Sequence, residues 1–226
     1  MIIRILDIFF SLTAIIFFLP IFIPVSLILK FTGESEIFYL QKRVGKDRKI
    51  FNIFKFATML KNSPNIGAGT ITIKNDPRIL PIGNFLRKTK INELPQLFNI
   101  LIGDMSVIGP RPLTARGFDV YSKEAQLAIQ KMRPGLSGIG SIIFRDEEIL
   151  LSGTEDPNQF YDKYIAPYKG SLELWFSSKL NLKNYLLLIF ITIWAVLFPK
   201  TQIVWKIFKS IPEPSSKISK SLNFLS

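Results

Sequence analysis

The chain has 226 residues, which suits one domain with attached segments, and its 29 Lys+Arg against 17 Asp+Glu give a formal net charge of +12. It contains no Cys and no His, which excludes disulfides, thiolate nucleophiles, Cys-based zinc sites and imidazole acid–base catalysis. Any catalytic metal must therefore be held by oxygen ligands, which favours Mg²⁺ or Mn²⁺.

The positive charge points to an anionic partner, and two classes of partner fit it. One is a membrane surface with phosphorylated ligands, which is favoured by the hydrophobic content of 48% and by the apolar segments described next. The other is nucleic acid, which basic globular domains bind. We favour the membrane and expect no nucleic-acid partner.

The first element is the uncharged run "IFFSLTAIIFFLPIFIPVSLIL" at residues 8–29, about as long as a helix that crosses a bilayer. Pro20 and Pro24 lie inside it, and proline kinks or breaks a helix. The residues alone leave two structures open, a kinked spanning helix and a helix–break–helix hairpin that returns to the same face. A basic cluster follows and predicts that this side is cytoplasmic: Lys42, Arg43, Lys46, Arg48 and Lys49.

The middle of the chain predicts short elements separated by turn residues. In chain order we expect two short strands joined by a Gly–Lys–Asp turn within 37–56, a loop at 63–69, a turn leading into a short helix at 75–89, helices at 93–103 and 119–132, and a short strand at 142–144.

The C-terminal part has its own apolar run at residues 185–199, which is short for a span and predicts an interfacial or buried helix. In the following "TQIVWKIFK", Val204, Trp205 and Phe208 either face lipid or pack into the core. Residues 210–226 are rich in Ser, Pro and Lys, which predicts a loose tail.

Charged residues gather in "FLRKTKINELPQLFNILIGDMSVIGPRP" at residues 85–112. Pro95 is expected in the first turn of a helix, which places Asn92 near the N-cap and Glu93 at the first helical position. A helix start of this kind attracts anions. Cations flank it on both sides, and together with Glu93 they suit a metal-bound pyrophosphate: Arg87, Lys88, Lys90 and Arg111.

Several ordered blocks resemble one known family, the bacterial sugar transferases, which are monotopic phosphoglycosyl transferases that act on polyprenol phosphate. The blocks are "QKRVG" at 41–45, "FNIFKFATM" at 51–59, "NDPRILPIGNFLRKTKINELPQLFNILIGDMSVIGPRPL" at 75–113 and "MRPGLSG" at 132–138. The resemblance runs from the N-terminal membrane segment to about residue 145.

The resemblance implies an activity and its partners. The family moves a sugar-1-phosphate from a UDP-sugar to undecaprenyl phosphate, releases UMP and requires Mg²⁺, which starts the assembly of a capsule, exopolysaccharide or O-antigen. It also implies a re-entrant N-terminal helix, so we favour the hairpin over the span. The active site would then lie on the cytoplasmic face of the bacterial inner membrane, in contact with membrane lipid; a homodimer is an open alternative.

The expected fold is α/β (α+β): a helix-rich compact cytoplasmic domain with a small β-hairpin, an N-terminal re-entrant membrane helix and amphipathic interfacial helices. We divide the chain into a membrane helix at 1–33, a sugar transferase domain at 34–180, membrane-associated helices at 181–209 and a flexible tail at 210–226.

The resemblance also assigns roles to residues, with one departure. It implies an Asp–Glu catalytic dyad at positions that hold Asn92 and Glu93, with Asp as the nucleophile and Glu93 as a metal ligand. Phosphate or substrate binding falls to Lys55, Arg87, Gln96, Arg111 and Arg133.

Because an amide is a very poor nucleophile, three accounts of Asn92 stay open. Glu93 takes over as the nucleophile, or the acceptor phosphate attacks directly, or the chain binds a nucleotide sugar or lipid phosphate without turnover. The first two make it an enzyme and the third a silent binding protein; we favour an enzyme with direct attack.

Overall fold

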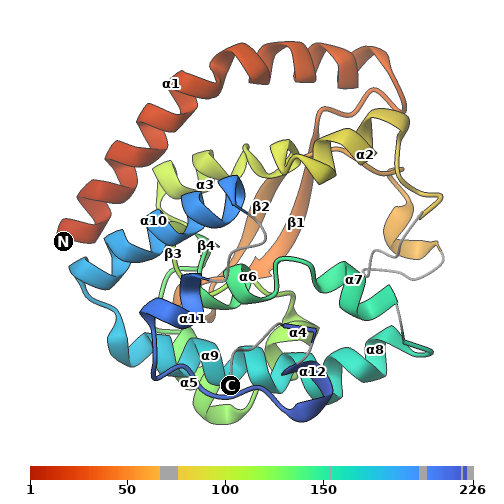
Figure 1. The fold of residues 1–226 in the computed structure, drawn as a ribbon. Coiled ribbons are helices and arrows are strands. Elements are labelled where there is room, and N and C mark those ends of the chain that lie inside the picture. Colours follow the sequence, from red (N-terminus) through yellow and green to blue (C-terminus); the bar gives the residue numbers. More distant parts are fainter. Residues whose placement is uncertain (67–75, 153, 199–202, 220, 223–226) are drawn as a thin grey trace.

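The structure, a computed structural model, describes residues 1–66, 76–152, 154–198, 203–219 and 221–222. Helices dominate these residues, and two small sheets of two strands each complete the fold (Figure 1). The predicted helix-rich α/β class is confirmed. The elements are α1 (Ile2–Phe31), β1 (Phe38–Val44), η1 (Lys46–Arg48), β2 (Ile50–Phe56), η2 (Ser63–Asn65), α2 (Pro81–Lys88), η3 (Ile91–Glu93), α3 (Gln96–Ile102), β3 (Ser106–Ile108), α4 (Ala115–Asp119), α5 (Lys123–Ile129), β4 (Gly135–Ser137), α6 (Ile139–Ile143), α7 (Glu147–Ser152), α8 (Pro157–Phe160), η4 (Tyr161–Ile165), α9 (Ala166–Lys179), α10 (Leu182–Leu197), α11 (Ile203–Ile207) and α12 (Ser216–Ser219).

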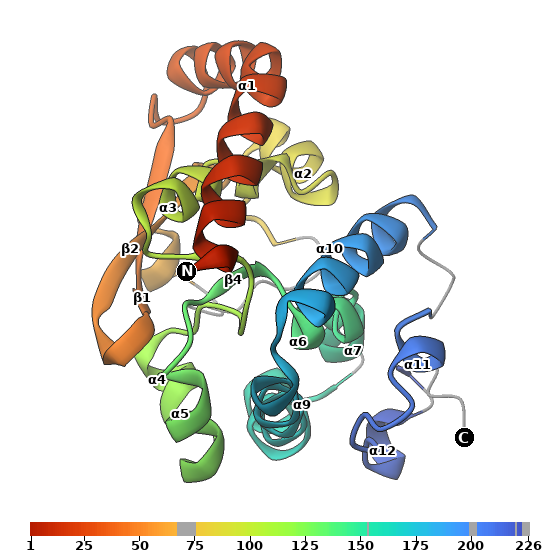
Figure 2. The ribbon, with the colours of Figure 1, turned by 90° about the vertical axis from the view of Figure 1, so that its left-hand side faces the viewer.

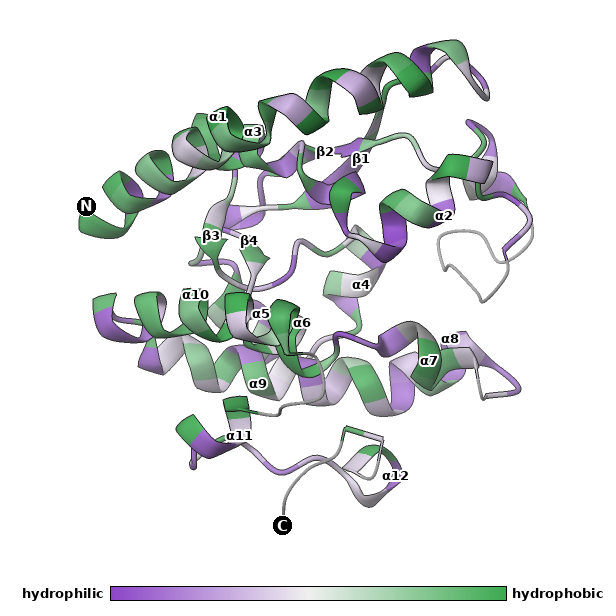
Figure 3. Cartoon of the chain, turned by 45° about the horizontal axis from the view of Figure 1, so that its top comes forward, coloured by the Kyte–Doolittle hydropathy of each residue, from purple (hydrophilic) through white to green (hydrophobic). Residues whose placement is uncertain are grey.

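The N-terminal helix α1 continues from Ile2 to Phe31 with Pro20 and Pro24 inside it. Its ribbon bends, so that its two arms run in different directions over the domain (Figures 1 and 2). The predicted break of the helix at the prolines is therefore wrong. The helix continues through them and bends, because bending accommodates the missing hydrogen bond and the bulk of the proline ring. Among the helices described, α1 is the one long and apolar enough to cross a membrane, and the colouring in Figure 3 shows that hydrophobic residues predominate along it.

The β-hairpin predicted within residues 37–56 is confirmed. β1 and β2 pair antiparallel, with Val44 opposite Ile50 at the closed end and Phe38 opposite Phe56 at the open end. The turn η1 places Asp47 in the left-handed region (φ 55°), which Asp tolerates better than most residues. Its N–H donates to the carbonyl oxygen of Gln130 at 2.7 Å, which ties the turn to the domain.

The second sheet was missed by the sequence analysis. β3 and β4 pair in parallel, with Ser106 opposite Gly135 and Ile108 opposite Ser137. Three residues are too few to show the alternation that identifies a strand. The strand predicted at 142–144 is wrong: α6 occupies Ile139–Ile143, and a short run of β-branched residues does not distinguish a strand from a buried helix.

The other short elements follow the predictions in narrower bounds. The helices expected at 75–89, 93–103 and 119–132 are α2, α3 and α5; α5 begins only at Lys123, because α4 ends at Asp119. α5 begins after Ser122, whose Oγ accepts the N–H of Ala125. The expected loop at 63–69 contains η2, and its residues beyond 66 lie outside those described.

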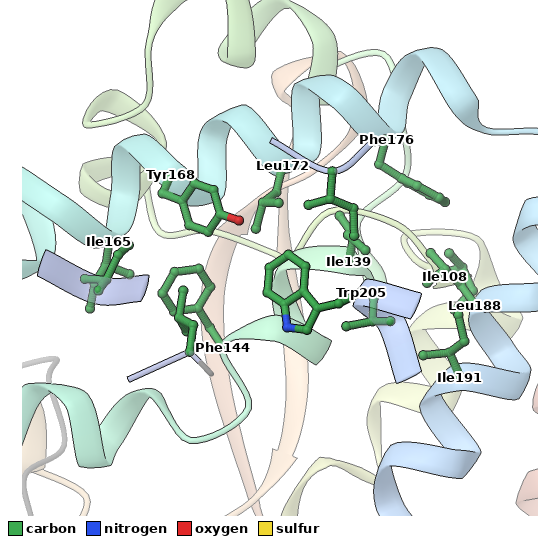
Figure 4. Close-up of a cluster of buried hydrophobic side chains, with 14 of the residues drawn as sticks. Ile108, Ile139, Phe144, Ile165, Tyr168, Leu172, Phe176, Leu188, Ile191 and Trp205 are labelled. Carbon is green, nitrogen blue, oxygen red and sulfur yellow. The ribbon is translucent and has the colours of Figure 1, made fainter. Parts of the chain in front are cut away.

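The largest core packs α9 against α6, α10 and the C-terminal segments (Figure 4). Val204 and Trp205 are buried in it, so of the two alternatives for these residues the structure has core packing. α10 buries Tyr185, Leu188 and Ile191 there, while its opposite face exposes further apolar residues: Leu182, Leu186, Phe190, Ile193, Val196 and Leu197.

The expected loose tail is instead packed on this core, as far as the structure describes it. Ile211, Ile218 and Leu222 are buried, and the hydroxyl of Tyr168 donates to the carbonyl oxygen of Pro212 at 2.8 Å. The prediction failed because it used the average polarity of the segment, and these three buried apolar residues are widely spaced within it.

Candidate active site

A pocket opens between the β1–β2 hairpin, the segment from η3 into α3, and the loop that follows β3. Five polar or charged side chains and four other residues line it: Arg43, Lys55, Glu93, Gln96 and Arg111, with Ile53, Pro112, Gly135 and Leu136. Four of the residues predicted for the site are thus brought together from segments far apart in the sequence. "The pocket" denotes this set below.

The hairpin presents Arg43 and Lys55 on one face. Lys55 lies opposite Tyr39, and paired residues point to the same face of the sheet. Every second side chain of a strand also points to one face, so Arg43, four residues after Tyr39, shares the face of Lys55. β2 pairs with β1 along one edge, and the side chain of Asn99 in α3 makes hydrogen bonds to its other edge. Its Oδ1 accepts the N–H of Phe54 at 2.9 Å and its Nδ2 donates to the carbonyl oxygen of Asn52 at 2.8 Å. This amide fixes α3, and Gln96 at its start, against the hairpin.

Glu93 reaches the pocket from a 3₁₀ turn and not from a helix start. Lys90 adopts a left-handed conformation (φ 61°), η3 follows, and α3 begins only at Gln96 with Pro95 as its N-cap. The predicted N-cap role of Asn92 is therefore wrong, as is the placement of Pro95 within the first turn. Tight turns of this kind precede many α-helices, and sequence spacing does not separate them from the helix itself.

Arg111 lies in a loop held by close backbone packing. The N–H of Gly109 donates to the carbonyl oxygen of Ser137 at 2.9 Å, and that of Gly135 donates to the carbonyl oxygen of Pro110 at 2.8 Å. A Cβ on Gly135 would lie 2.1 Å from the nitrogen of Gly109, so only glycine permits this approach.

The charges of the pocket act strongly on one another. Nη2 of Arg111 lies 3.7 Å from Oε1 of Glu93, whose side chain is 18% exposed. Burial alone would raise the pKa of the Glu93 carboxyl, but Arg111, Lys55 and Lys90 outweigh it and lower that pKa. Glu93 in turn raises the pKa of Arg111. Glu93 is therefore a carboxylate at neutral pH.

The two hairpin cations have lowered pKa values. Burial is the main cause for both, and the neighbouring Arg111 acts in the same direction while Glu93 opposes it; together these effects lower the pKa of Lys55 to about 8 and that of Arg43 to about 10. Like charges crowded in this way are stabilised when an anion binds among them.

Arg43 was missed as a site residue. Its Nη1 donates to the carbonyl oxygen of Pro112 at 3.1 Å and its Nη2 donates to Oε1 of Gln41, while its buried Nε has no partner within the described part of the chain. The signal was present in the sequence: pairing the two strands symmetrically about the predicted turn would have placed Arg43 on the face of Lys55.

Three predicted site residues do not line the pocket. Asn92 is buried, and its Oδ1 has no hydrogen-bond partner among the residues described. Arg87 lies close enough to Lys55 to lower its pKa, with Nη1 3.8 Å from the sulfur of Met59. Nε of Arg133 donates to the carbonyl oxygen of Gly103 at 2.8 Å, which ties it to the end of α3.

For a metal ion, the pocket offers a limited set of ligands. Over the residues described, no three Asp or Glu side chains come together as a cluster. Glu93 is the carboxylate that lines the pocket, with the amide of Gln96 beside it. Mg²⁺ is commonly held by one or two carboxylates together with substrate phosphates, and Glu93 fits that kind of site.

Comparison with known proteins agrees with the resemblance seen in the sequence. Residues 1–199 match the family described as "Bacterial sugar transferase". Three relatives illustrate the similarity. The UDP-N-acetylgalactosamine-undecaprenyl-phosphate N-acetylgalactosaminephosphotransferase of Aeromonas hydrophila is 37% identical over 61% of this chain and 33% of its own length. The UDP-glucose:undecaprenyl-phosphate glucose-1-phosphate transferase of Escherichia coli is 32% identical over 77% of this chain and 37% of its own length. The exopolysaccharide production protein ExoY of Sinorhizobium fredii is 32% identical over 64% of this chain and 70% of its own length. The chain thus spans about a third of the first two relatives.

Proposed function

The chain belongs to the bacterial sugar transferase family, and on that premise we propose that it transfers a sugar-1-phosphate from a UDP-sugar to undecaprenyl phosphate. UMP is the other product, and the lipid-linked sugar starts the synthesis of an exopolysaccharide or another surface glycan. The names of the relatives from Aeromonas hydrophila and Escherichia coli describe this kind of transfer.

The observation that carries the proposal is the excess of positive charge in the pocket. Arg43, Lys55 and Arg111 are three cations, and among the described residues that line the pocket Glu93 is the one carboxylate. A diphosphate supplies the missing negative charge, and guanidinium groups bind phosphate oxygens with directed hydrogen bonds. Helix α1 packs against α3 and β3 of the domain that holds the pocket, and this packing supports an acceptor bound in lipid nearby.

In the proposed reaction an oxygen of the acceptor phosphate attacks the phosphorus that carries the sugar. The bond from this phosphorus to the bridging oxygen breaks, and UMP leaves with that oxygen and its electron pair. Arg43, Lys55 and Arg111 neutralise the charge that develops on the phosphate oxygens. Because phosphoryl transfer needs mainly positioning and charge neutralisation, these residues account for most of the chemistry required of the protein.

We assign Mg²⁺ to Glu93 and the substrate phosphates. A bound Mg²⁺ would withdraw charge from the diphosphate and orient it. Glu93 suits this role because it remains ionised in the pocket.

Direct attack by the acceptor is our preferred account of Asn92. The amide of Asn92 does not line the pocket, and Glu93 is engaged by Arg111 and Lys55. The test is the order of addition. Enzyme mixed with UDP-sugar alone should release almost no UMP and keep its intact mass, and undecaprenyl phosphate should then start the release. A burst of UMP with a phosphosugar adduct on Glu93 would contradict direct attack.

The activity itself is tested by UMP release from a panel of UDP-sugars, with undecaprenyl phosphate and Mg²⁺. Release that depends on the acceptor, with one sugar preferred, supports the proposal. The second candidate is a silent membrane-bound binding protein, favoured by the amide at position 92. It predicts saturable binding of UDP-sugar with no UMP released from any member of the panel.

We also propose that α1 enters the membrane from the cytoplasmic side and returns to it, so that the pocket faces the cytoplasm at the inner membrane. The bend of α1 and the basic residues that follow it support this placement. A tag fused before Met1 should then resist an external protease in spheroplasts. Cleavage of the tag while the domain stays protected would show a spanning helix.

A further inference from the structure

One buried carboxylate joins α1 to two other elements. Asp7, which is 1% exposed, is the acidic residue of this largely apolar helix. Its Oδ1 accepts hydrogen bonds from Oγ of Ser106, from the N–H of Val107 and from the hydroxyl of Tyr185, each at 2.8 Å. A buried carboxylate without partners is strongly unfavourable, so these donors are what permits Asp7 here. We call Asp7, Ser106, Val107 and Tyr185 the Asp7 joint.

Arg4 strengthens the same attachment one turn earlier. Its Nη1 donates to the carbonyl oxygen of Ile100 at 2.5 Å and its Nη2 donates to that of Leu101 at 2.8 Å. These carbonyls end α3, where a helix leaves its acceptors unpaired and favours a cation. Arg4 and Asp7 are three residues apart and share one face of α1. The first arm of α1 is thus fixed to the domain by polar contacts.

The second arm of α1 is attached differently. Phe22, Val25 and Leu29 pack in an apolar cluster with Phe56 and Leu86, and over the residues that the structure describes this arm has no comparable polar contacts. Apolar packing tolerates small shifts, whereas hydrogen bonds fix distance and direction. The opposite face of the helix exposes large apolar side chains along its length, including Ile5, Phe9, Leu12, Ile16, Phe17, Ile23 and Leu27.

The strand that binds Asp7 leads directly to the pocket. Val107 and Ser106 belong to β3, and Arg111 follows three residues after its end. β4, the partner of β3, contributes Gly135, and Leu136 beside it also lines the pocket. The Asp7 joint therefore links the long apolar helix α1 to the strands that carry one wall of the pocket.

We propose that Asp7 is a positioning residue that sets the height of the pocket relative to the lipid around α1, and so controls transfer to a lipid-bound acceptor without affecting nucleotide binding. The inference rests on the proposed function. A nucleotide arrives from water and contacts only the domain. An acceptor phosphate on a long lipid is confined to one depth, so a shift of about 1 Å between α1 and the pocket is enough to reduce the rate by about 100-fold.

The experiment compares Asp7→Leu, Asp7→Asn and Tyr185→Phe in lipid nanodiscs. Ser11→Ala is the matched control, because Ser11 is buried on the next turn and, among the described residues, its Oγ bonds only to the carbonyl oxygen of Ile8 in its own helix. Transfer is measured with undecaprenyl phosphate and, in detergent, with a short water-soluble prenyl phosphate. UDP affinity is measured by titration calorimetry.

With undecaprenyl phosphate we expect a loss of about 10-fold to 100-fold for Asp7→Leu and smaller losses for Asp7→Asn and Tyr185→Phe. UDP affinity and the rate with the short acceptor should stay at the wild-type values, as should every property of Ser11→Ala. Equal losses with both acceptors and with UDP would show a general structural defect and overturn the inference. Wild-type transfer in all Asp7 variants would overturn it as well.

A second readout needs no activity. The N–H of Val107 bonds to Asp7, so its hydrogen exchange should accelerate in Asp7→Leu and not in Ser11→Ala. Unchanged exchange at Val107 would show that the joint does not form. If the wild-type chain transfers no sugar phosphate at all, the proposed function fails and this inference with it. A transferring wild type with indifferent Asp7 variants refutes the inference alone.

Discussion

Two groups of charged residues lie close to Arg111, and they differ in how their charges are matched. The pocket holds the three cations Arg43, Lys55 and Arg111 against the single carboxylate of Glu93, which leaves two positive charges over. The second group, the Lys169 cluster, consists of Glu147, Lys169 and Glu173. There Nζ of Lys169 lies 2.6 Å from Oε2 of Glu147, and Lys169 and Glu173 are buried.

The Lys169 cluster is balanced within itself. Burial raises the pKa of Glu173 to about 8, so this carboxyl is mostly neutral at pH 7 and one cation faces one anion. Lys169 also lies 5.0 Å from the ring centre of Phe144 and 5.6 Å from that of Tyr161. A balanced, enclosed group serves the fold, whereas unmatched cations that line an opening serve a ligand. The comparison thus separates two roles among similar residues.

The largest effect is expected when one Glu→Gln substitution is made in each group and the transfer rates of the two variants are compared. Glu93→Gln should reduce transfer by about 100-fold or more, because it removes the carboxylate of the pocket while keeping its shape. Glu147→Gln should leave transfer near the wild-type rate and lower the melting temperature. UMP release and thermal unfolding measure the two. Asn92→Ala should weaken transfer only modestly, since that side chain does not line the pocket.

Transfer that persists in Glu93→Gln would end the assignment of the pocket. A loss in Glu147→Gln as large as that in Glu93→Gln would instead show that the Lys169 cluster takes part in the reaction.

Breaking the Lys169 cluster should destabilise the fold. Lys169→Met leaves Glu147 without its partner, and removing one member of a buried ion pair costs about 3 kcal/mol. We expect this loss in the free energy of unfolding by denaturant. Lys179→Met on the same helix is the control: Lys179 is exposed, and its loss should cost at most about 0.5 kcal/mol. Equal stability of the two variants would contradict the structural role.

The affinity of the pocket for UDP should also depend on pH, and we expect this dependence to come from Lys55 and not from the Lys169 cluster. Lys55, with its pKa lowered to about 8, is charged below that pH and loses its charge as the pH rises through it. A nucleoside diphosphate is fully ionised above about pH 7. UDP affinity should therefore be constant near pH 7 and fall by about 10-fold towards pH 9. Lys55→Arg keeps its charge and should flatten the profile; a profile unchanged in that variant would assign the fall to another group.

Sequence reasoning went furthest where a residue's neighbours in the chain determine its place. The hairpin was predicted because two alternating strands flank a turn, and Lys55, Glu93, Gln96 and Arg111 were found through family motifs. It failed where distant contacts decide. The 3₁₀ turn that carries Glu93, the three-residue strands β3 and β4, and the packing of Ile211, Ile218 and Leu222 all depend on tertiary partners. The Asp7 joint was missed for the same reason: its donors lie about 100 and 178 positions away.

The two lysines offer the most direct test of the claim that the unmatched cations bind the diphosphate. UDP affinity should be measured by titration calorimetry at pH 7 for the wild-type chain, Lys55→Met and Lys169→Met, at a temperature where all three are folded. We expect Lys55→Met to bind UDP about 10-fold more weakly and Lys169→Met to bind it like the wild type. Wild-type affinity in Lys55→Met, or no saturable binding of UDP by the unmodified chain, would contradict the account.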